Sequence, residues 1–376
     1  MSSEHRVIVI GCGGPGAAAL YWTARATRGG VLGLDAGRVG AVPERGHVLS
    51  RTQPLDVHAA LAPAALDAWD AVARVSGQQL VTDTGELVVA EASPVLDGYR
   101  AVAARHRVPL EELDAAALHA RWPQLRPTGH ERALHQRGAG VVDARRAAAV
   151  HLALARGQGA HVLENTPVRA VRPGREHVEV VTDDAVHRAE QVVVTADAVA
   201  VDLLAGLGRP LPLTTRFEQV TRYATANLLD HSPGALPVVR WHGAEELVAL
   251  PVDGAIATTL DQELDTAPSF EADALARKRR EEFLAEHLPG FGGPELSSTT
   301  SRSALAPDRH LVVDTVPEAP SVHVAVGTGH AAAYASLLGR VLAEFATAGR
   351  SRFPVDTFTL ERPALQDADF ERRFAF

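Results

Sequence analysis

Short apolar runs lie near both ends of the chain and close to its middle, and each ends at a glycine or a polar residue. Runs of four or five such residues are typical of strands buried on both faces of a parallel sheet. Longer helical patterns separate them at residues 55–75, at 331–347, and after Asp143, which we expect to cap a helix ending at 156. The pattern predicts an α/β fold with short strands at 6–10, Val31–Leu34, 191–195, 311–313 and Val322–Val326.

The middle of the chain follows a different pattern. Residues 80–90 alternate around Thr84-Gly85, a hairpin is expected across Pro173-Gly174, and further strands are expected at 214–226, 238–241, 246–250 and 255–260. These last strands predict a second sheet that is antiparallel. We therefore expect an α/β domain with an inserted, mainly antiparallel α+β domain; the glycines at 11, 13 and 16 after the first strand indicate that the former is a Rossmann-like nucleotide-binding domain and the latter the substrate domain. The first would comprise residues 1–84, 143–213 and 309–376, and the second residues 85–142 and 214–308.

A glycine-rich turn follows the first predicted strand, and an acid follows the second. A strand, a GxGxxG turn, a helix and a carboxylate in this order form the unit that binds the ADP half of a dinucleotide. The glycines allow a tight turn, a close approach of the backbone to a pyrophosphate, and close packing of helix and strand. The alternative is a doubly wound core whose glycine turn binds nothing. The candidate cofactor residues here are Gly11, Gly13, Gly14, Pro15, Gly16 and Asp35.

Composition excludes several classes of function. The net charge of −9 argues against a nucleic-acid or anionic-membrane partner, and no apolar run is long enough to span a bilayer. The first strand begins too early for a signal peptide, so we expect a cytoplasmic protein. Cys12 is the only cysteine, which excludes a disulfide framework, and no histidine pair has metal-ligand spacing. The only lysine, Lys278, lies in a charged run within an expected helix at Phe270–His287, where the charges predict a solvated face.

Motifs along nearly the whole chain resemble those of the flavin-dependent amine and amino-acid oxidases of the D-amino-acid oxidase superfamily. Within it, the chain is most similar to the monomeric sarcosine oxidases and N-methyltryptophan oxidases. The order and spacing of the motifs carry this resemblance more than any single one. Besides the N-terminal turn they are Thr84-Gly85-Glu86-Leu87, Arg121-Trp122-Pro123, Gly140-Val141-Val142-Asp143, Asn165-Thr166-Pro167-Val168, Val192-Val193-Val194-Thr195-Ala196, Glu218-Gln219-Val220, Pro307-Asp308-Arg309-His310-Leu311-Val312-Val313-Asp314, Val326-Gly327-Thr328-Gly329-His330 and Glu361-Arg362-Pro363-Ala364-Leu365.

The resemblance implies FAD as the cofactor and oxidation of a C–N bond in a small amine or amino acid. In such proteins a hydride equivalent passes from the substrate to the flavin, and an arginine binds the substrate carboxylate. Arg51 lies close to the family's arginines. Glu263 falls near a family active-site histidine, where it either favours a cationic substrate amine or is a solvated surface residue. By position, further cofactor contacts are expected from Val168 (through its backbone to the adenine), Ala196, Gly327, Gly329 and His330.

The chain departs from its relatives around the flavin. Ser301 stands where close relatives attach the flavin through a cysteine, so the resemblance implies noncovalent FAD. Thr259 and Ala333 stand where relatives carry lysines, which leaves Arg302 and His330 as candidate cations. Asp197 replaces a neutral residue near the cofactor, where it either disturbs the flavin or caps a helix.

These departures leave three hypotheses open: an amine oxidase, a dehydrogenase that passes electrons to a carrier, and a noncatalytic relative acting as a subunit or binding protein. A rapid reoxidation of the flavin by air would separate the first from the second. Relatives of this kind also imply a monomer or a small homo-oligomer.

Overall fold

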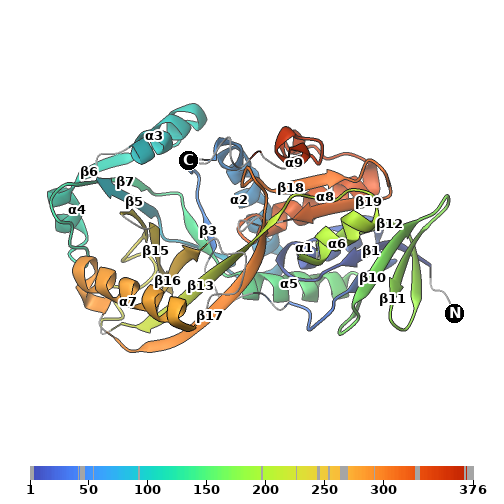
Figure 1. The fold of residues 1–376 in the computed structure, drawn as a ribbon, viewed down its shortest axis with the longest axis horizontal. Helices are drawn as coiled ribbons and strands as arrows, with labels where there is room; N and C mark the ends of the chain where they lie inside the picture. The colour runs from blue at the N-terminus through green and yellow to red at the C-terminus, as the bar shows by residue number, and fades with distance from the viewer. Residues whose placement is uncertain are drawn as a thin grey trace.

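The computed structural model describes residues 4–40, 42, 47–53, 55–91, 94–195, 198–225, 227–243, 246–252, 255–262, 270–291, 293–326, 331–367 and 370. Two large sheets lie toward opposite ends of the long axis of the molecule (Figure 1). The long strands β13 (Thr214–Ala224) and β17 (Glu295–Leu305) belong to the second sheet and extend toward the first. The predicted arrangement of a parallel core plus a mainly antiparallel sheet is therefore confirmed.

The cofactor sheet is built around β1 (Glu4–Ile10), which pairs in parallel with β2 (Val31–Leu34) and β12 (Val186–Val194). The strands β9 (His161–Leu163) and β19 (Val322–Val326) extend it, also in parallel. The predicted hairpin across Pro173-Gly174 is confirmed as β10 (Val168–Pro173) and β11 (Val178–Thr182), which pair antiparallel. The structure adds that β11 pairs antiparallel with the early part of β12. One expectation was wrong: β18 (Val312–Thr315) pairs antiparallel with β19, since a short connection returns the chain beside the same strand.

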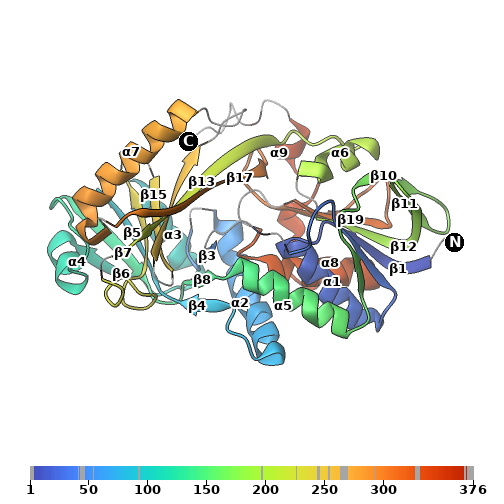
Figure 2. The ribbon, with the colours of Figure 1, turned by 90° about the horizontal axis from the view of Figure 1, so that it is seen from below.

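The second sheet, here called the substrate sheet, has the order β17-β13-β16-β15-β14-β5-β7-β6. Its pairs are antiparallel except β14 with β5. A small third sheet, β3-β8-β4, lies with α2 (Asp56–Ser76) between the two large sheets (Figure 2). The remaining strands are β3 (His47–Leu49), β4 (Val81–Asp83), β5 (Glu86–Glu91), β6 (Glu111–Asp114), β7 (Glu131–Gln136), β8 (Gly140–Val142), β14 (Val238–His242), β15 (Glu246–Val252) and β16 (Ala255–Gln262).

Helices pack against both large sheets. Asp143 caps α5 through a hydrogen bond from the Arg146 N–H (2.9 Å), as predicted. The helices are α1 (Gly14–Thr27), α2 (Asp56–Ser76), α3 (Pro94–His106), α4 (Ala115–Arg121), α5 (Ala144–Gly157), α6 (Ala198–Gly206), α7 (Phe270–His287), α8 (Ala335–Ala348) and α9 (Pro363–Gln366), with short 3-10 turns at Pro289–Phe291 and Asp356–Phe358.

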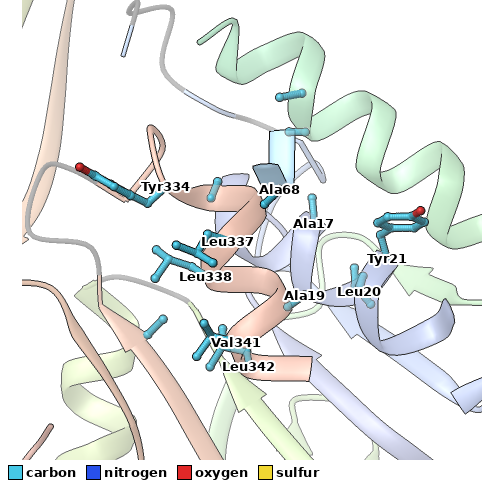
Figure 3. Packing of buried hydrophobic residues seen from close by; sticks show 14 of the residues in the cluster. Ala17, Ala19, Leu20, Tyr21, Ala68, Tyr334, Leu337, Leu338, Val341 and Leu342 are labelled. Carbon is cyan, nitrogen blue, oxygen red and sulfur yellow. The ribbon is translucent and has the colours of Figure 1, made fainter. Parts of the chain in front are cut away.

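The core of the cofactor half forms where α8 crosses α1. Leu337, Leu338, Val341 and Leu342 of α8 lie among small residues of α1 such as Ala17 and Ala19 (Figure 3). The two helices approach closely because α8 carries Gly339: a Cβ there would lie 2.4 Å from the backbone carbon of Ala18. This packing fixes α8, whose N-terminal end follows the turn expected to approach the flavin.

Two sequence expectations about helices need correction. The last long helix begins at Ala335 rather than 331, because residues 331–334 form turns before it. The charged run on α7 is not wholly a solvated face. Arg277, Lys278 and Arg279 are exposed, whereas Arg280 is buried and bonds to the backbone and side-chain oxygens of Gln219. Position 280 lies one turn before the buried Leu284 and therefore shares its face.

The domain boundaries proposed from the sequence remain a prediction. The helices show no candidate membrane span among the described residues.

Candidate functional site: the glycine turn and the Arg51 segment

The glycine turn has the form that the sequence predicted. Gly11 follows β1 with φ of 84°, in the left-handed region, and Gly13 occupies the N-cap position of α1. No side chain among the described residues caps the helix, and its first turn holds no acid. Pro15 adds no N–H group. The unpaired N–H groups and the helix dipole therefore give this end of α1 the character of an anion-binding site.

Two of the glycines serve different purposes. A Cβ on Gly16 would lie 1.7 Å from the carbonyl oxygen of Gly11 and 2.6 Å from Oγ1 of Thr195, so the turn cannot close with any larger residue there. A Cβ on Gly13 would meet no described atom within 4 Å. Gly16 thus holds the turn together, whereas Gly13 borders open space at the positive end of the helix. This arrangement fits the pyrophosphate of a dinucleotide.

Asp35 follows β2 at the side of this turn. Its carboxylate accepts hydrogen bonds from the N–H groups of Cys12 (2.7 Å) and Gly37 (2.9 Å). A carboxylate has about four acceptor positions, so two bonds leave capacity for the hydroxyl groups of a ribose. The backbone of Asp35 accepts from the N–H of Thr166 (2.7 Å), which brings the start of β10, with Val168, to the same end of the sheet.

We expect Cys12, the only cysteine of the chain, to be unreactive. The Cys12 thiol is fully buried beside the turn, and its burial raises its pKa well above the ordinary value. The sulfur lies 3.8 Å from the Leu34 carbonyl oxygen, to which it donates. A thiol in such surroundings is a poor nucleophile.

Several predicted site residues lie outside the described residues: Ala196, Asp197, Glu263, Gly327, Gly329 and His330. For Thr259, Ser301 and Arg302 only the backbone is described. In the register of the substrate sheet, Thr259 pairs with Val220 and Val248, Ser301 pairs with Glu218, and Arg302 pairs with Phe217. Their roles therefore stay predictions.

Arg51 is the one predicted substrate contact whose side chain is described. It lies half-buried after β3, where its N–H donates to Oε1 of Gln136 (3.0 Å). Its side chain passes over Gly138, at which a Cβ would lie 3.0 Å from Cδ and 3.2 Å from Nη1 of Arg51. The Nε atom of Arg51 is buried and has no hydrogen-bond partner among the described residues. Arg51 as a whole is only half-buried and forms no ion pair with an acid among the described residues, so its guanidinium is a candidate partner for an anionic ligand.

A buried polar group that the sequence analysis did not assign lies beside Arg51. Glu86 is fully buried. Its Oε2 accepts from Oγ of Ser50 (2.6 Å) and Nε2 of Gln136 (2.8 Å), and its Oε1 accepts from Nε of Arg240 (3.3 Å). Arg240 also pairs with Glu246. In the sequence, Glu86 stands in the Thr84-Gly85-Glu86-Leu87 motif and directly precedes the apolar run of residues 87–90, which gave no sign that its side chain is buried.

Neighbouring side chains raise the pKa of Arg240, the cation of this buried group. Loss of solvent by itself lowers the pKa of Arg240, but Tyr99, Glu86 and Glu246 outweigh that effect and raise it above the ordinary value. Burial raises the pKa of Tyr99 as well. Arg240 is therefore a permanent cation that compensates the buried carboxylate of Glu86. No cluster of potential metal ligands occurs among the described residues.

Comparisons with known proteins agree with this geometry. The family model described as "FAD dependent oxidoreductase" (DAO) matches residues 6–345. The chain belongs to this family. It is therefore an FAD-dependent oxidoreductase with the fold of the DAO amino acid oxidases.

Relatives match this DAO protein over almost its full length. It is 30% identical to the monomeric sarcosine oxidase of Streptomyces avermitilis, over 98% of this chain and 100% of that protein. It is 27% identical to the N-methyl-L-tryptophan oxidase of Citrobacter koseri, over 96% of this chain and 99% of the other. Among solved structures, the open form of NikD, described as an unusual amino acid oxidase essential for nikkomycin biosynthesis, superposes with a TM-score of 0.85 at 20% identity, over 95% of this chain and 98% of NikD.

Proposed function

We propose that this FAD-dependent oxidoreductase oxidises the C–N bond of an amino acid, or of a related amine, to an imine. The names of its relatives support an N-methylated amino acid as the substrate class, since sarcosine is N-methylglycine. The observation that carries the proposal for this chain is Arg51, a half-buried arginine beside Gly138 that pairs with no acid among the described residues and suits the carboxylate of such a substrate.

The residues present fit FAD, and we assign them by position. The N–H groups at Gly13, Gly14 and Gly16 face the pyrophosphate, Asp35 receives the ribose hydroxyls, and the backbone of Val168 faces the adenine. When bound, FAD accepts a hydride equivalent from the carbon next to the substrate nitrogen. Pro15 and Gly11 shape the turn. Ala196, Gly327, Gly329 and His330 remain the proposed contacts of the flavin half.

We also propose that the FAD is held noncovalently. Ser301 occupies the position at which relatives attach the flavin through cysteine, and a hydroxyl is a far weaker nucleophile than a thiolate. The buried, weakly acidic Cys12 lies at the pyrophosphate turn, away from the ring.

Arg51 provides the substrate contact in this proposal. A planar guanidinium binds a carboxylate through two parallel hydrogen bonds, which fixes the orientation of the amino acid as well as its affinity. Arg302, His330 and Glu263 remain proposed contributors to charge beside the ring and the substrate amine. The remaining expectations, a cytoplasmic monomer or small homo-oligomer with a small-molecule substrate, complete the proposal.

The test has two stages. The visible spectrum of the purified protein is recorded before and after acid precipitation, and the flavin colour should move into the supernatant. Colour retained in the pellet would contradict noncovalent binding. The holoenzyme is then titrated without oxygen against a panel of N-methylated and primary amino acids, and the visible flavin absorbance should bleach. If no amine bleaches a flavin that dithionite reduces, the proposed reaction is wrong.

A second candidate keeps the reaction and changes the electron acceptor. Thr259 and Ala333 stand where relatives carry lysines, and Ala333 is buried, with its carbonyl oxygen accepting from Nε1 of Trp69 (2.8 Å). Without a cation at either position, oxygen reduction loses an electrostatic stabilisation, which favours a dehydrogenase. Rapid reoxidation of the reduced flavin by air would rule this candidate out.

A further inference from the structure

The short segment that carries Arg51 is held from two sides. On one side, Gln136 accepts from the Arg51 N–H (3.0 Å), and Ser50 bonds to Glu86 (2.6 Å). On the other side, Nε2 of Gln53 donates to the hydroxyl of Tyr334 (2.7 Å), just before α8. The segment therefore connects the substrate sheet to the helix that follows the expected flavin turn, and Arg51 lies between the two anchors.

The anchor on the substrate sheet is a buried charge network. Glu86 and Gln136 are direct cross-strand partners on β5 and β7, and Arg240 lies on the neighbouring strand, β14, two residues along from the partner of Glu86. The side chain of Gln136 donates to Glu86 and Ser50 through Nε2 while accepting from Arg51 through Oε1. Every carboxylate oxygen and every atom of this amide group thus has a partner.

Burying these charged and polar side chains costs desolvation free energy, which apolar side chains packed in the same place would not. The residues around Glu86 on the sheet, such as Val88 and Val238, are apolar and buried. An apolar residue at position 86 would avoid the desolvation of a carboxylate, and buried ion pairs are often replaceable without loss of stability. Buried polar networks do, however, fix one geometry, because any other arrangement leaves a donor or an acceptor unpaired. The geometry fixed here is that of Ser50, Arg51 and Thr52.

We propose that Gln136 and Glu86 are positioning residues that hold the backbone of Arg51 so that its guanidinium meets the carboxylate of the substrate. Arg240 donates to Oε1 of Glu86 (3.3 Å) and thereby orients its carboxyl group. This inference rests on the proposed function of Arg51 and adds residues that determine its precision. Specificity for a carboxylate then depends on β5 and β7, strands far from Arg51 in the sequence.

The experiment measures carboxylate binding apart from turnover. Holoenzyme is titrated with propionate, and binding is followed by the change in the visible spectrum of the bound flavin. Gln136→Met keeps the side-chain length and removes both hydrogen-bonding atoms. We expect it to raise the propionate Kd about tenfold or more, which corresponds to the loss of one hydrogen bond. Ser50→Ala, a smaller change, should raise the Kd less and serves if Gln136→Met fails to fold.

The control is Thr221→Val, which removes a hydrogen-bonding hydroxyl that is equally buried in the same sheet on β13. It should leave the propionate Kd unchanged. Arg51→Met should raise the Kd at least as much as Gln136→Met, and the double variant should bind no more weakly than Arg51→Met alone, because Gln136 acts through Arg51.

Turnover gives a second readout. With the best amino acid of the panel and its decarboxylated amine, Gln136→Met should raise KM for the amino acid and leave kcat/KM for the amine nearly unchanged. Equal losses for both substrates, an unchanged propionate Kd, or additive effects in the double variant would overturn the positioning role. If Arg51→Met itself leaves propionate binding intact, the proposed function of Arg51 fails instead.

Discussion

The expected cofactor site consists mainly of backbone groups, whereas the expected substrate site consists of side chains. In the cofactor half, backbone N–H groups at the start of α1 and one carboxylate at the end of β2 face the expected ligand. In the substrate half, the Arg51 N–H bonds to the side chain of Gln136, which in turn donates to Glu86 on a separate strand. A backbone site tolerates change in most side chains but not in its glycines. A side-chain site tolerates changes in packing but not the loss of a hydrogen-bond partner.

The largest predicted effect tests the backbone site. Gly16→Ala places a Cβ 1.7 Å from the Gly11 carbonyl oxygen, so the turn must open. We expect loss of several kcal/mol of folding free energy, about 3 or more, together with loss of bound FAD. The measurements are thermal unfolding and flavin content.

Gly13→Ala is the matched control, because its Cβ meets no described atom within 4 Å. We expect an unchanged melting temperature for the apoprotein and FAD affinity reduced about tenfold or more by crowding of the pyrophosphate. If Gly13→Ala binds FAD normally, the assignment of this turn to the pyrophosphate is wrong.

The next effect tests the buried charges of the substrate half. Glu86→Leu leaves Arg240 without one of its two carboxylate partners, and breaking a buried pair costs about 3 to 5 kcal/mol. The double variant Glu86→Leu with Arg240→Met should recover much of that stability in urea unfolding. It should not restore propionate binding, since Ser50 and Gln136 remain without the carboxylate. If the double variant recovers both stability and propionate binding, Glu86 does not position the Arg51 segment.

Arg51 itself should affect catalysis more than stability. Arg51→Met removes both hydrogen bonds to the substrate carboxylate, and we expect kcat/KM for the amino acid to fall about 100-fold, or ~2.7 kcal/mol. Arg51→Lys should recover only part of this loss, because an ammonium group cannot bind a carboxylate through a planar pair. Steady-state kinetics with the amino acid and its decarboxylated amine measure the difference. Equal losses for both substrates would contradict the role of Arg51.

Acid should weaken the cofactor half through two buried histidines. Burial lowers the pKa of His151 on α5 and of His323 on β19 from 6.5 to about 4. The unfolded chain therefore takes up these protons below about pH 6.5, whereas the folded protein does so only near pH 4. Their contribution to stability is complete above pH 6.5 and falls through this window, by up to ~1.4 kcal/mol per pH unit for each histidine. Urea unfolding at several pH values measures the slope, and His323→Gln should flatten it.

The smallest predicted effect tests whether open space around a glycine predicts that alanine is tolerated there. Gly98 lies inside α3, and a Cβ there meets no described atom within 4 Å. Gly98→Ala should stabilise the protein by about 0.5 to 1 kcal/mol, because it improves helix propensity without a clash. A destabilising result would show that open space around a glycine does not predict tolerance in this chain.

The sequence allowed more of the cofactor half than of the substrate half to be predicted. Gly11, Gly16 and Asp35 are neighbours through one strand–turn–helix unit, so their local spacing specifies the geometry. The antiparallel substrate sheet was also predicted, from alternation. The pairing of Glu86 with Gln136 and Arg240 depends on register between strands up to 154 residues apart, which no local pattern encodes. For the same reason Arg280 on α7 was assigned to solvent, although it contacts Gln219 on β13.

We expect an amino acid to reduce the flavin because its carboxylate binds the guanidinium of Arg51. The most direct test is the rate of anaerobic flavin reduction in wild-type holoenzyme by the best amino acid and by its decarboxylated amine. At equal low concentrations the amino acid should reduce the flavin about 100-fold faster, in proportion to the two hydrogen bonds that only it forms. Equal rates, or faster reduction by the amine, would contradict the claim.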